Sequence, residues 1–148
     1  MLEKAMILAA NAHMGQLDKG GHPYILHPIR VMLGCKNLDE KVVAILHDTL
    51  EDCDLTADDL LREGFSEYIV DAVVCLTRNE SDDYMEHIQE VAKNPLATVV
   101  KLSDLADNMD LNRLPGLTPK DFQRLERYLR AKLLLEAEQQ KRCCLTNK

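Results

Sequence analysis

The part of this sequence with the clearest chemical potential is the pair His47-Asp48, followed one helical turn later by Glu51 and Asp52. Apolar residues surround the pair, so its ionisable groups are expected to be buried. Burial costs on the order of several kcal/mol unless such groups are paired or bind a metal. Spacings of three and four residues place Glu51 on the same helix face as the pair. On spacing alone, the same residues could equally be acidic surface groups at a helix end.

Two further segments supply residues that bind metals. His27 stands at the expected start of a helix, and Asp104 follows an apolar run. With His47 and Asp48 they make a set of two histidines and two carboxylates, which suits Mn²⁺, Fe²⁺ or Zn²⁺. Such an ion lowers the pKa of its bound water and polarises a phosphoryl oxygen. The four residues therefore predict a divalent metal site.

Two more residues are placed to assist a reaction at that site. Glu51 can accept a proton from the water, because it shares a helix face with the His-Asp pair. Asn108 follows Asp104 by one turn and can orient the water or the scissile phosphate. Together with the metal ligands, these residues favour hydrolysis of a phosphate ester.

Four separate blocks resemble the hydrolase domain of RelA/SpoT-type enzymes and the small stand-alone alarmone hydrolases, which are HD-domain phosphohydrolases. The blocks are Ala12–Gln16, Pro23–Pro28, His47–Asp52 and Lys101–Met109. The likeness runs from about residue 2 to about residue 130. It implies an all-α, single-domain bundle of the HD type that binds Mn²⁺. The implied reaction is removal of the 3′-pyrophosphate of (p)ppGpp by a metal-activated water.

The resemblance also assigns roles residue by residue. The metal ligands would be His27, His47, Asp48 and Asp104. The catalytic residues would be Glu51, Asp52 and Asn108. The substrate contacts would be Lys19, in the loop before Pro-Tyr-Ile, and the pair Arg124 and Tyr128 on the last helix. Nothing in the chain resembles the synthetase half of the long bifunctional enzymes.

The chain departs from the family pattern at two places. Asp18 stands where a base-stacking arginine is expected, and a carboxylate cannot stack as a guanidinium does. After Asp104, where family members usually carry basic residues, the chain has Leu105, Asp107 and Asp110. Metal-assisted hydrolysis is compatible with both departures, whereas recognition of guanine is less directly predicted.

Three functions therefore remain open. The first is the (p)ppGpp 3′-pyrophosphohydrolase. The second, favoured by Asp18, is an HD phosphohydrolase of another nucleotide or of a phosphorylated cofactor. The third is a non-catalytic metal- or nucleotide-binding module, which the presence of Glu51 and Asn108 disfavours. Arg78 either approaches the site from a helix end or lies on the surface, and His87, in a polar segment, is expected to be exposed.

Helical signals run through the whole chain. Helices are expected at about residues 2–15, 24–34, 39–52, 56–63, 66–76, 82–93, 95–108 and 118–140. Asp39, Thr56 and Ser66 are predicted to cap the third, fourth and fifth of them, and Pro95 to begin the seventh. We therefore expect an all-α bundle of about eight helices, with residues 1–141 as the hydrolase domain and 142–148 as a polar, disordered tail.

Composition limits the partners. The 148 residues carry 18 Lys and Arg against 25 Asp and Glu, a formal charge of −7, which argues against nucleic acid and anionic membranes. No apolar run approaches the roughly 18 residues of a membrane span. A small nucleotide is the expected partner, and the oligomeric state stays open. The five cysteines, including Cys143-Cys144, form no CxxC motif, and no signal-peptide pattern occurs, so free thiols and a cytoplasmic location are expected.

Overall fold

The fold consists of helices over the residues that the computed structural model describes, 1–79 and 81–146. No strand occurs within them, and a single isolated β-bridge joins Leu17 to Pro23. This confirms the expected all-α architecture. The helices, in chain order, are α1 (Leu2–Ala12), α2 (Leu26–Leu33), α3 (Leu38–Leu46), α4 (Thr49–Asp52), α5 (Ala57–Arg62), α6 (Glu67–Leu76), α7 (Tyr84–Lys93), α8 (Pro95–Asn108), the 3₁₀ helix η1 (Leu111–Arg113) and α9 (Pro119–Thr146).

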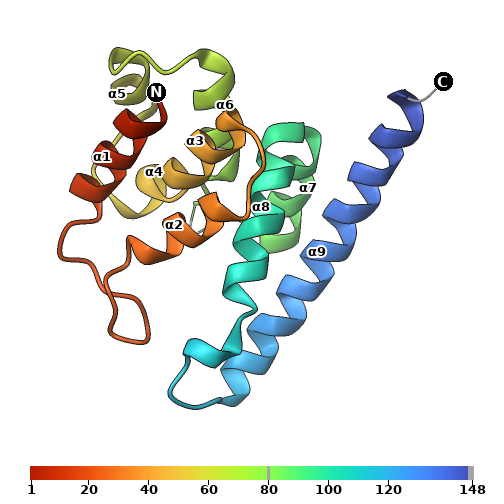
Figure 1. The fold of residues 1–148 in the computed structure, drawn as a ribbon. Coiled ribbons are helices and arrows are strands. Elements are labelled where there is room, and N and C mark those ends of the chain that lie inside the picture. The colour runs from red at the N-terminus through yellow and green to blue at the C-terminus, as the bar shows by residue number, and fades with distance from the viewer. Residues whose placement is uncertain (80, 147–148) are drawn as a thin grey trace.

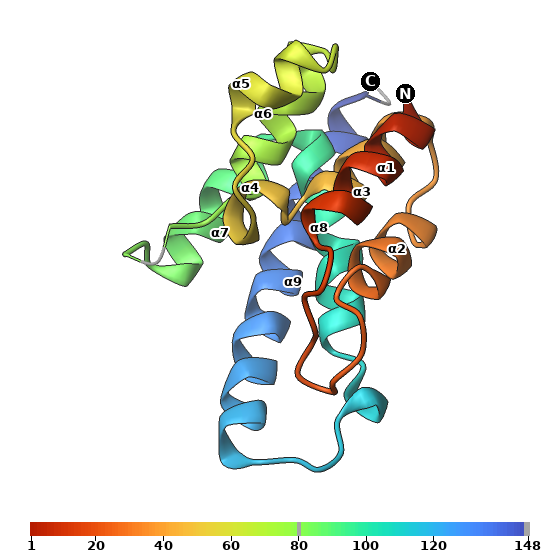
Figure 2. The same cartoon turned by 90° about the vertical axis from the view of Figure 1, so that its left-hand side faces the viewer.

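Two helices, α3 and α8, form the centre of the bundle (Figure 1). They pack against each other and both contact α2 and α6, while α1 covers α3 and the pair α7 and α9 covers α8. Figure 2 shows the turn between α8 and α9, with η1, at one end of the molecule and α5 at the other. The fully buried side chains include Ile45, Leu46, Val100, Leu105 and Leu135. No helix in the described part of the chain is long and apolar enough to cross a membrane.

Three of the four predicted helix starts are confirmed. The side chains of Thr56 and Ser66 accept backbone hydrogen bonds at the starts of α5 and α6, and Pro95 begins α8. The predicted cap Asp39 is wrong, because Asn37 caps α3 instead. The Asn37 side chain accepts a hydrogen bond from the Glu40 backbone amide, and the Glu40 carboxylate accepts one from the Asn37 backbone amide. This reciprocal pairing starts the helix one residue earlier than expected.

The expected single helix over residues 39–52 is interrupted at His47 and Asp48, so the eight expected helices become nine among the described residues. Two of the last carbonyls of α3 accept hydrogen bonds from side chains. His47 Nδ1 donates to the Ala44 carbonyl at 2.7 Å, and Thr49 Oγ1 donates to the Leu46 carbonyl at 2.7 Å. Local side-chain bonds of this kind compete with the helical ladder. The interruption is therefore caused by the same histidine that the sequence marked as functional.

Close packing of α2 on α8 brings two of the predicted ligand-bearing helices together. A Cβ added at Gly34 would overlap the Ser103 hydroxyl, so only glycine fits there without movement. That hydroxyl donates to the Val31 carbonyl at 2.8 Å, across 72 residues of sequence. The pair fixes how the last turn of α2 rests on the middle of α8.

Helix α9 continues to Thr146, so its expected end at about residue 140 is too early, and the part of the predicted disordered tail up to residue 146 is helical. Arg142 explains the extension. Its guanidinium donates to the Ala92 carbonyl in the last turn of α7 and to Thr98 Oγ1 at 3.4 Å. Carbonyls at helix ends lack helical partners and need such donors. The last two residues of the predicted tail, 147 and 148, lie outside the described residues.

His87 is a further correction, because it is buried and only 8% exposed. Its neighbours in sequence are polar, which predicted exposure. In α7, however, it lies one turn before Val91 and beside Ile88, which are both fully buried. Helical periodicity decides its environment more than the polarity of the adjacent residues.

The packing of α9 can be tested at two leucines of the same helix. Leu135 is fully buried, whereas Leu133 is 67% exposed. We expect Leu135→Ala to lower the free energy of unfolding by about 2–5 kcal/mol, because it leaves a cavity in the core. Leu133→Ala should change it by less than about 0.5 kcal/mol. Urea denaturation followed by circular dichroism measures both, and equal losses would contradict the packing of α9 described here.

Candidate metal centre

Three helical segments bring the predicted ligands into one place. His27 lies in the first turn of α2, His47 and Asp48 lie at the junction of α3 and α4, and Asp104 lies on α8. One ligand atom each of His27, His47 and Asp104 lie within 4.8 Å of one another, and all three residues are buried. Asp48 Oδ2 lies 3.0 Å from His47 Nε2 and 3.5 Å from His27 Nε2. These three residues could hold a metal ion, with Asp48 at their side.

The His47 ring provides the test of whether a cation fits. Its Nδ1 donates a proton to the Ala44 carbonyl, so the neutral ring carries a lone pair on Nε2. Nε2 is buried without a hydrogen-bond partner, despite the 3.0 Å approach of Asp48 and the 3.7 Å approach of Asp104. A lone pair facing two carboxylates is repulsive unless positive charge lies between them. The donor set therefore fits a divalent metal.

The His27 ring is oriented by a carboxylate that the sequence interpretation did not use. Its Nδ1 donates to Asp107 Oδ2 at 2.6 Å, and Arg30 holds the other Asp107 oxygen at 2.7 Å. His27 Nε2 then faces Asp104 Oδ1 at 3.2 Å. Metal-binding histidines commonly donate their second nitrogen in this way. Asp107 follows Asp104 by three residues, so helical spacing could have indicated the role.

The charges at the centre favour a cation. Burial alone would lower the pKa of His27 and His47, yet the surrounding carboxylates raise both above the ordinary value. Burial would raise the pKa of Asp104, but Lys101, 2.8 Å from Asp104 Oδ2, and the two histidines hold it well below its usual range. Asn108 Nδ2 donates to Asp104 Oδ1 at 2.6 Å. The carboxylates therefore stay ionised and fixed in position.

The two acidic residues after the His-Asp pair lie at the exposed edge of this centre. Glu51 Oε2 accepts the Arg78 backbone amide at 2.9 Å, which fixes the carboxylate toward the loop after α6. Burial, together with the charges of Asp48 and Asp52, raises the pKa of Glu51, although the Arg78 amide opposes the shift. Burial and Asp48 also raise the pKa of Asp52. Both side chains are thus better proton acceptors than free carboxylates.

A hollow of about 360 Å³ opens beside the centre, and we call it the Lys19 hollow. It brings together the three predicted substrate contacts, Lys19 from the loop after α1 and Arg124 and Tyr128 from α9. His27 and Asn108 line the same hollow, so it reaches the candidate metal ligands. Burial and the charge of Arg124 lower the pKa of Lys19. Lys19 and Arg124 thus place two positive charges in the same hollow, and Arg124 is paired with Asp121 at 3.1 Å.

Asp18 also lines the Lys19 hollow, but its carboxylate organises the loop. Its Oδ1 accepts backbone hydrogen bonds from Gly20 and His22, both at 2.9 Å. Asp110, another of the unexpected acids, similarly accepts the Asn112 amide at 3.1 Å and starts η1. These acidic residues have local structural roles that the sequence interpretation missed. The sequence signal for the first role is an aspartate just before a Gly-Gly turn, because such an aspartate commonly accepts hydrogen bonds from the backbone amides that follow it.

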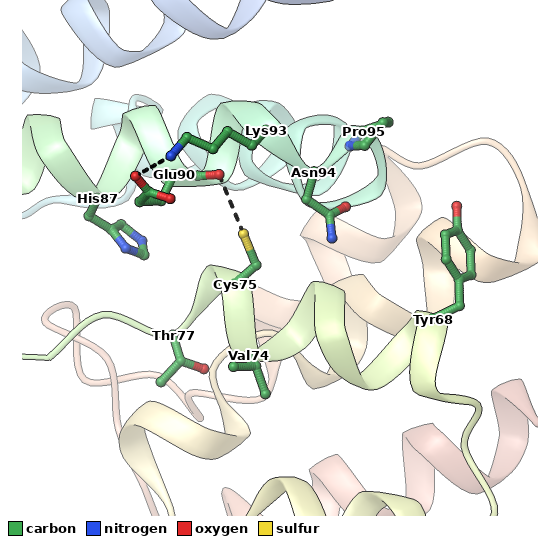
Figure 3. Close-up of a pocket in the computed structure, with 9 residues that line it drawn as sticks. All are labelled: Tyr68, Val74, Cys75, Thr77, His87, Glu90, Lys93, Asn94 and Pro95. Atoms are coloured by element: carbon green, nitrogen blue, oxygen red, sulfur yellow. Dashed lines mark hydrogen bonds and ion pairs between the residues drawn. The ribbon is translucent and has the colours of Figure 1, made fainter.

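A separate hollow of about 580 Å³ lies between the end of α6 and α7, and Figure 3 shows its lining. Cys75 points across it, and its thiol donates to the Glu90 carbonyl at 3.7 Å. None of the predicted metal, catalytic or substrate residues lines this hollow. His87 is drawn at its edge and also lines a smaller hollow near Asp104.

The chain is similar to parts of longer curated proteins. It is 33% identical over 126 residues to a GTP pyrophosphokinase of Myxococcus xanthus, covering 74% of this chain and 17% of that protein. It is 32% identical over 120 residues to a guanosine-3′,5′-bis(diphosphate) 3′-pyrophosphohydrolase of Aquifex aeolicus, with coverages of 73% and 17%. A protein of the same name from Vibrio cholerae is 30% identical over 142 residues, with coverages of 85% and 20%. The chain thus spans a fifth or less of these relatives.

A solved structure, described as a metazoan ortholog of SpoT that hydrolyzes ppGpp, has a TM-score of 0.71 with this chain. The two are 22% identical, and the match covers 95% of this chain and 94% of that one, so they share a fold. A scan against models of protein families finds no match. The fold and the order of the H…HD…D residues define an HD-type domain. More narrowly, the chain is a domain similar to the hydrolase domain of RelA/SpoT-type proteins.

The orientation of His27 by Asp107 predicts a measurable effect on metal binding. We expect Asp107→Ala to weaken Mn²⁺ binding by about 10–100-fold, because the His27 ring loses the partner that fixes its tautomer and direction. Titration calorimetry of the metal-free protein with Mn²⁺ measures the affinity directly. Asp71→Ala, at an exposed position of α6, is the matched control and should bind as the unchanged protein does. Equal affinities of the two variants would show that Asp107 does not orient the ligand.

Proposed function

We propose that this chain is a metal-dependent phosphohydrolase that removes the 3′-pyrophosphate of (p)ppGpp. The observation that carries the proposal is the convergence of His27, His47 and Asp104, with Asp48 within 3.5 Å of both histidines and each histidine donating its second nitrogen elsewhere. The similarity to proteins named as 3′-pyrophosphohydrolases supports the substrate. We propose Mn²⁺ as the metal, with Zn²⁺ or Fe²⁺ as alternatives, since all three accept mixed imidazole and carboxylate ligands.

A divalent ion held by these four residues would lower the pKa of water and polarise the phosphoryl oxygen under attack. The protein would supply the remaining steps. Glu51 would take the proton of the attacking water, helped by its raised pKa, with Asp52 beside it. Asn108, fixed by its bond to Asp104, would orient the water or the phosphate. These are the roles that the family resemblance implies.

The proposed reaction balances without any other reactant. The oxygen of water forms a bond to the phosphorus that carries the ribose O3′, and the bond between this phosphorus and O3′ breaks. The electron pair of that bond stays on O3′, which takes up a proton. For ppGpp and one water, the products are GDP and pyrophosphate. The Lys19 hollow would hold the nucleoside side, with Lys19 and Arg124 on its 5′-phosphates and Tyr128 on the sugar or phosphate.

One observation favours a second candidate function. Asp18, not an arginine, stands in the lining of the Lys19 hollow where the family stacks an arginine on the base. An HD phosphohydrolase of the same fold that acts on another nucleotide or on a phosphorylated cofactor would accommodate this change. Its ligand would still be a small nucleotide-like anion. We propose a cytoplasmic location in either case, consistent with the free cysteines.

One assay separates these functions. The purified protein is incubated with Mn²⁺ and offered ppGpp, NADPH or simple nucleotides, and the products are resolved by chromatography. GDP and pyrophosphate from ppGpp would support the first proposal. Turnover of another phosphate ester alone would support the second. Metal binding without turnover of any of these substrates would contradict both and favour a non-catalytic binding module.

The assigned base can be tested by an isosteric change. We expect Glu51→Gln to retain metal and to lower the turnover rate by about 10²–10⁴-fold, since the amide cannot accept the proton. Glu67→Gln, at an exposed position of α6, is the control and should turn over normally. Calorimetry checks the metal, and product chromatography measures the rate. Normal turnover by Glu51→Gln would assign the base to another residue.

A further inference from the structure

The outer face of α9 carries apolar side chains that the proposed function does not use. Phe122, Leu129 and Leu133 are 57%, 47% and 67% exposed. The exposed residues Ala137 and Cys144 continue the same line toward the end of the helix, and we call the five residues the α9 stripe. At 100° per residue they fall within about 80° of the helix circumference. Exposed apolar residues gathered on one face mark an interaction surface, whereas scattered ones do not.

The α9 stripe lies opposite the side of α9 that packs inside the molecule. Ala131 and Leu135 are fully buried, and the centre of the stripe lies about 180° around the helix from them. Helices α7 and α8 pack against α9, and Figure 1 shows α9 along one edge of the molecule. The hollows beside the candidate metal centre are lined by other residues of this helix, Arg124, Arg127 and Tyr128. A partner on the stripe would therefore leave those hollows open.

Charged side chains border the stripe, and their order fits a second copy of this chain. Glu126 and Lys141 lie on one border, and Lys132 and Glu136 lie on the other. If two copies of α9 run antiparallel about a two-fold axis at Leu133, each residue before Leu133 faces one the same distance after it. Glu126 then lies within one position of Lys141 of the second copy, and Lys132 within two positions of Glu136. Opposite charges thus meet on both borders.

The apolar residues agree with the same register. Leu133 meets its own copy at the axis, Leu129 faces Ala137, and Phe122 faces Cys144, so the apolar contact continues along the helix pair. A parallel pair would instead bring each charged residue close to its own copy, and like charges that face each other are unfavourable. The antiparallel arrangement is therefore the one that both the stripe and its borders favour.

The ion pairs within one chain do not oppose this arrangement. Glu126 pairs with Arg130, and Lys141 pairs with Glu138, in each case one helical turn away at the surface. Exposed ion pairs of this kind contribute little to stability. The same side chains can therefore turn toward a second copy at small cost.

We propose that the α9 stripe is the interface of a homodimer in which two α9 helices pack antiparallel around a two-fold axis near Leu133. Such a contact uses the same surface on both copies, so it closes with two chains. The proposal is independent of the proposed hydrolysis, because neither the stripe nor its charged borders line the hollows beside the candidate metal centre.

The centre of the interface is tested by Leu133→Glu in the full chain. Size-exclusion chromatography with light scattering should give the unchanged protein the mass of two chains and Leu133→Glu the mass of one, since the substitution places two carboxylates together at the axis. Leu38→Glu is the matched control, because Leu38 at the start of α3 is also 67% exposed, and it should stay dimeric. A single-chain mass of the unchanged protein at every concentration would overturn the homodimer and leave the stripe to a different protein. A two-chain mass of Leu133→Glu would overturn it as well.

The antiparallel direction is tested by reversing charges on one border. Glu126→Lys and Lys141→Glu should each raise the dissociation constant of the dimer about 3–10-fold in sedimentation equilibrium, because each pair occurs twice in the dimer. The double variant restores opposite charges and should recover the affinity of the unchanged chain. Failure of the double variant to recover would overturn the antiparallel register.

Dimer formation also makes stability depend on protein concentration. The urea midpoint of the unchanged chain should rise with concentration, whereas that of Leu133→Glu should stay constant. A constant midpoint in both would contradict the dimer. The comparison of Leu133→Ala with Leu135→Ala is accordingly made below the dissociation constant, where the chain is a monomer. Circular dichroism confirms that each variant is folded.

Discussion

The central physical constraint in this protein is the burial of carboxylates against histidine nitrogens that carry lone pairs. His47 Nε2 and His27 Nε2 both face Asp48 and Asp104, and each ring has its other nitrogen bonded to an acceptor. Such a cluster is repulsive unless a cation is bound. Lys101 compensates one oxygen of Asp104, and the remaining charge requires a divalent ion or protons. The arrangement of the helices around α3 and α8 maintains this cluster.

Much of the fold could be predicted from the sequence, because capping residues and helical spacing are local. Thr56, Ser66 and Pro95 begin their helices as expected. The interruption at His47 could not be predicted, since it depends on the direction of the imidazole ring, whose Nδ1 donates to the Ala44 carbonyl. The extension of α9 depends on Arg142 reaching the carbonyl of Ala92, 50 residues away in sequence. Non-local contacts of this kind leave no pattern in a single sequence.

In the candidate site, too, the local features could be predicted and the non-local contacts could not. The types and spacing of the predicted ligands were informative, because an HD pair amid apolar residues implies a partner charge. Asp107 was taken as a departure from the family, yet it bonds His27 and Arg30, residues about 80 positions earlier. His87 was expected to be exposed and is buried. Its burial depends on which side of α7 packs against the core, and the polarity of its sequence neighbours does not indicate that side.

The candidate metal ligands and the residues that line the hollows lie in different parts of the chain, and this separation has an evolutionary consequence. All four candidate metal ligands lie between residues 27 and 104, whereas Arg124, Arg127 and Tyr128 lie in the first half of α9. The second half of α9 is held by Leu135 in the core and by Arg142 against the end of α7. Side chains that line the hollows beside the candidate metal centre can therefore change on one half of a helix whose other half keeps it in place. Descendants of such a chain could diverge at these positions while keeping the four candidate metal ligands.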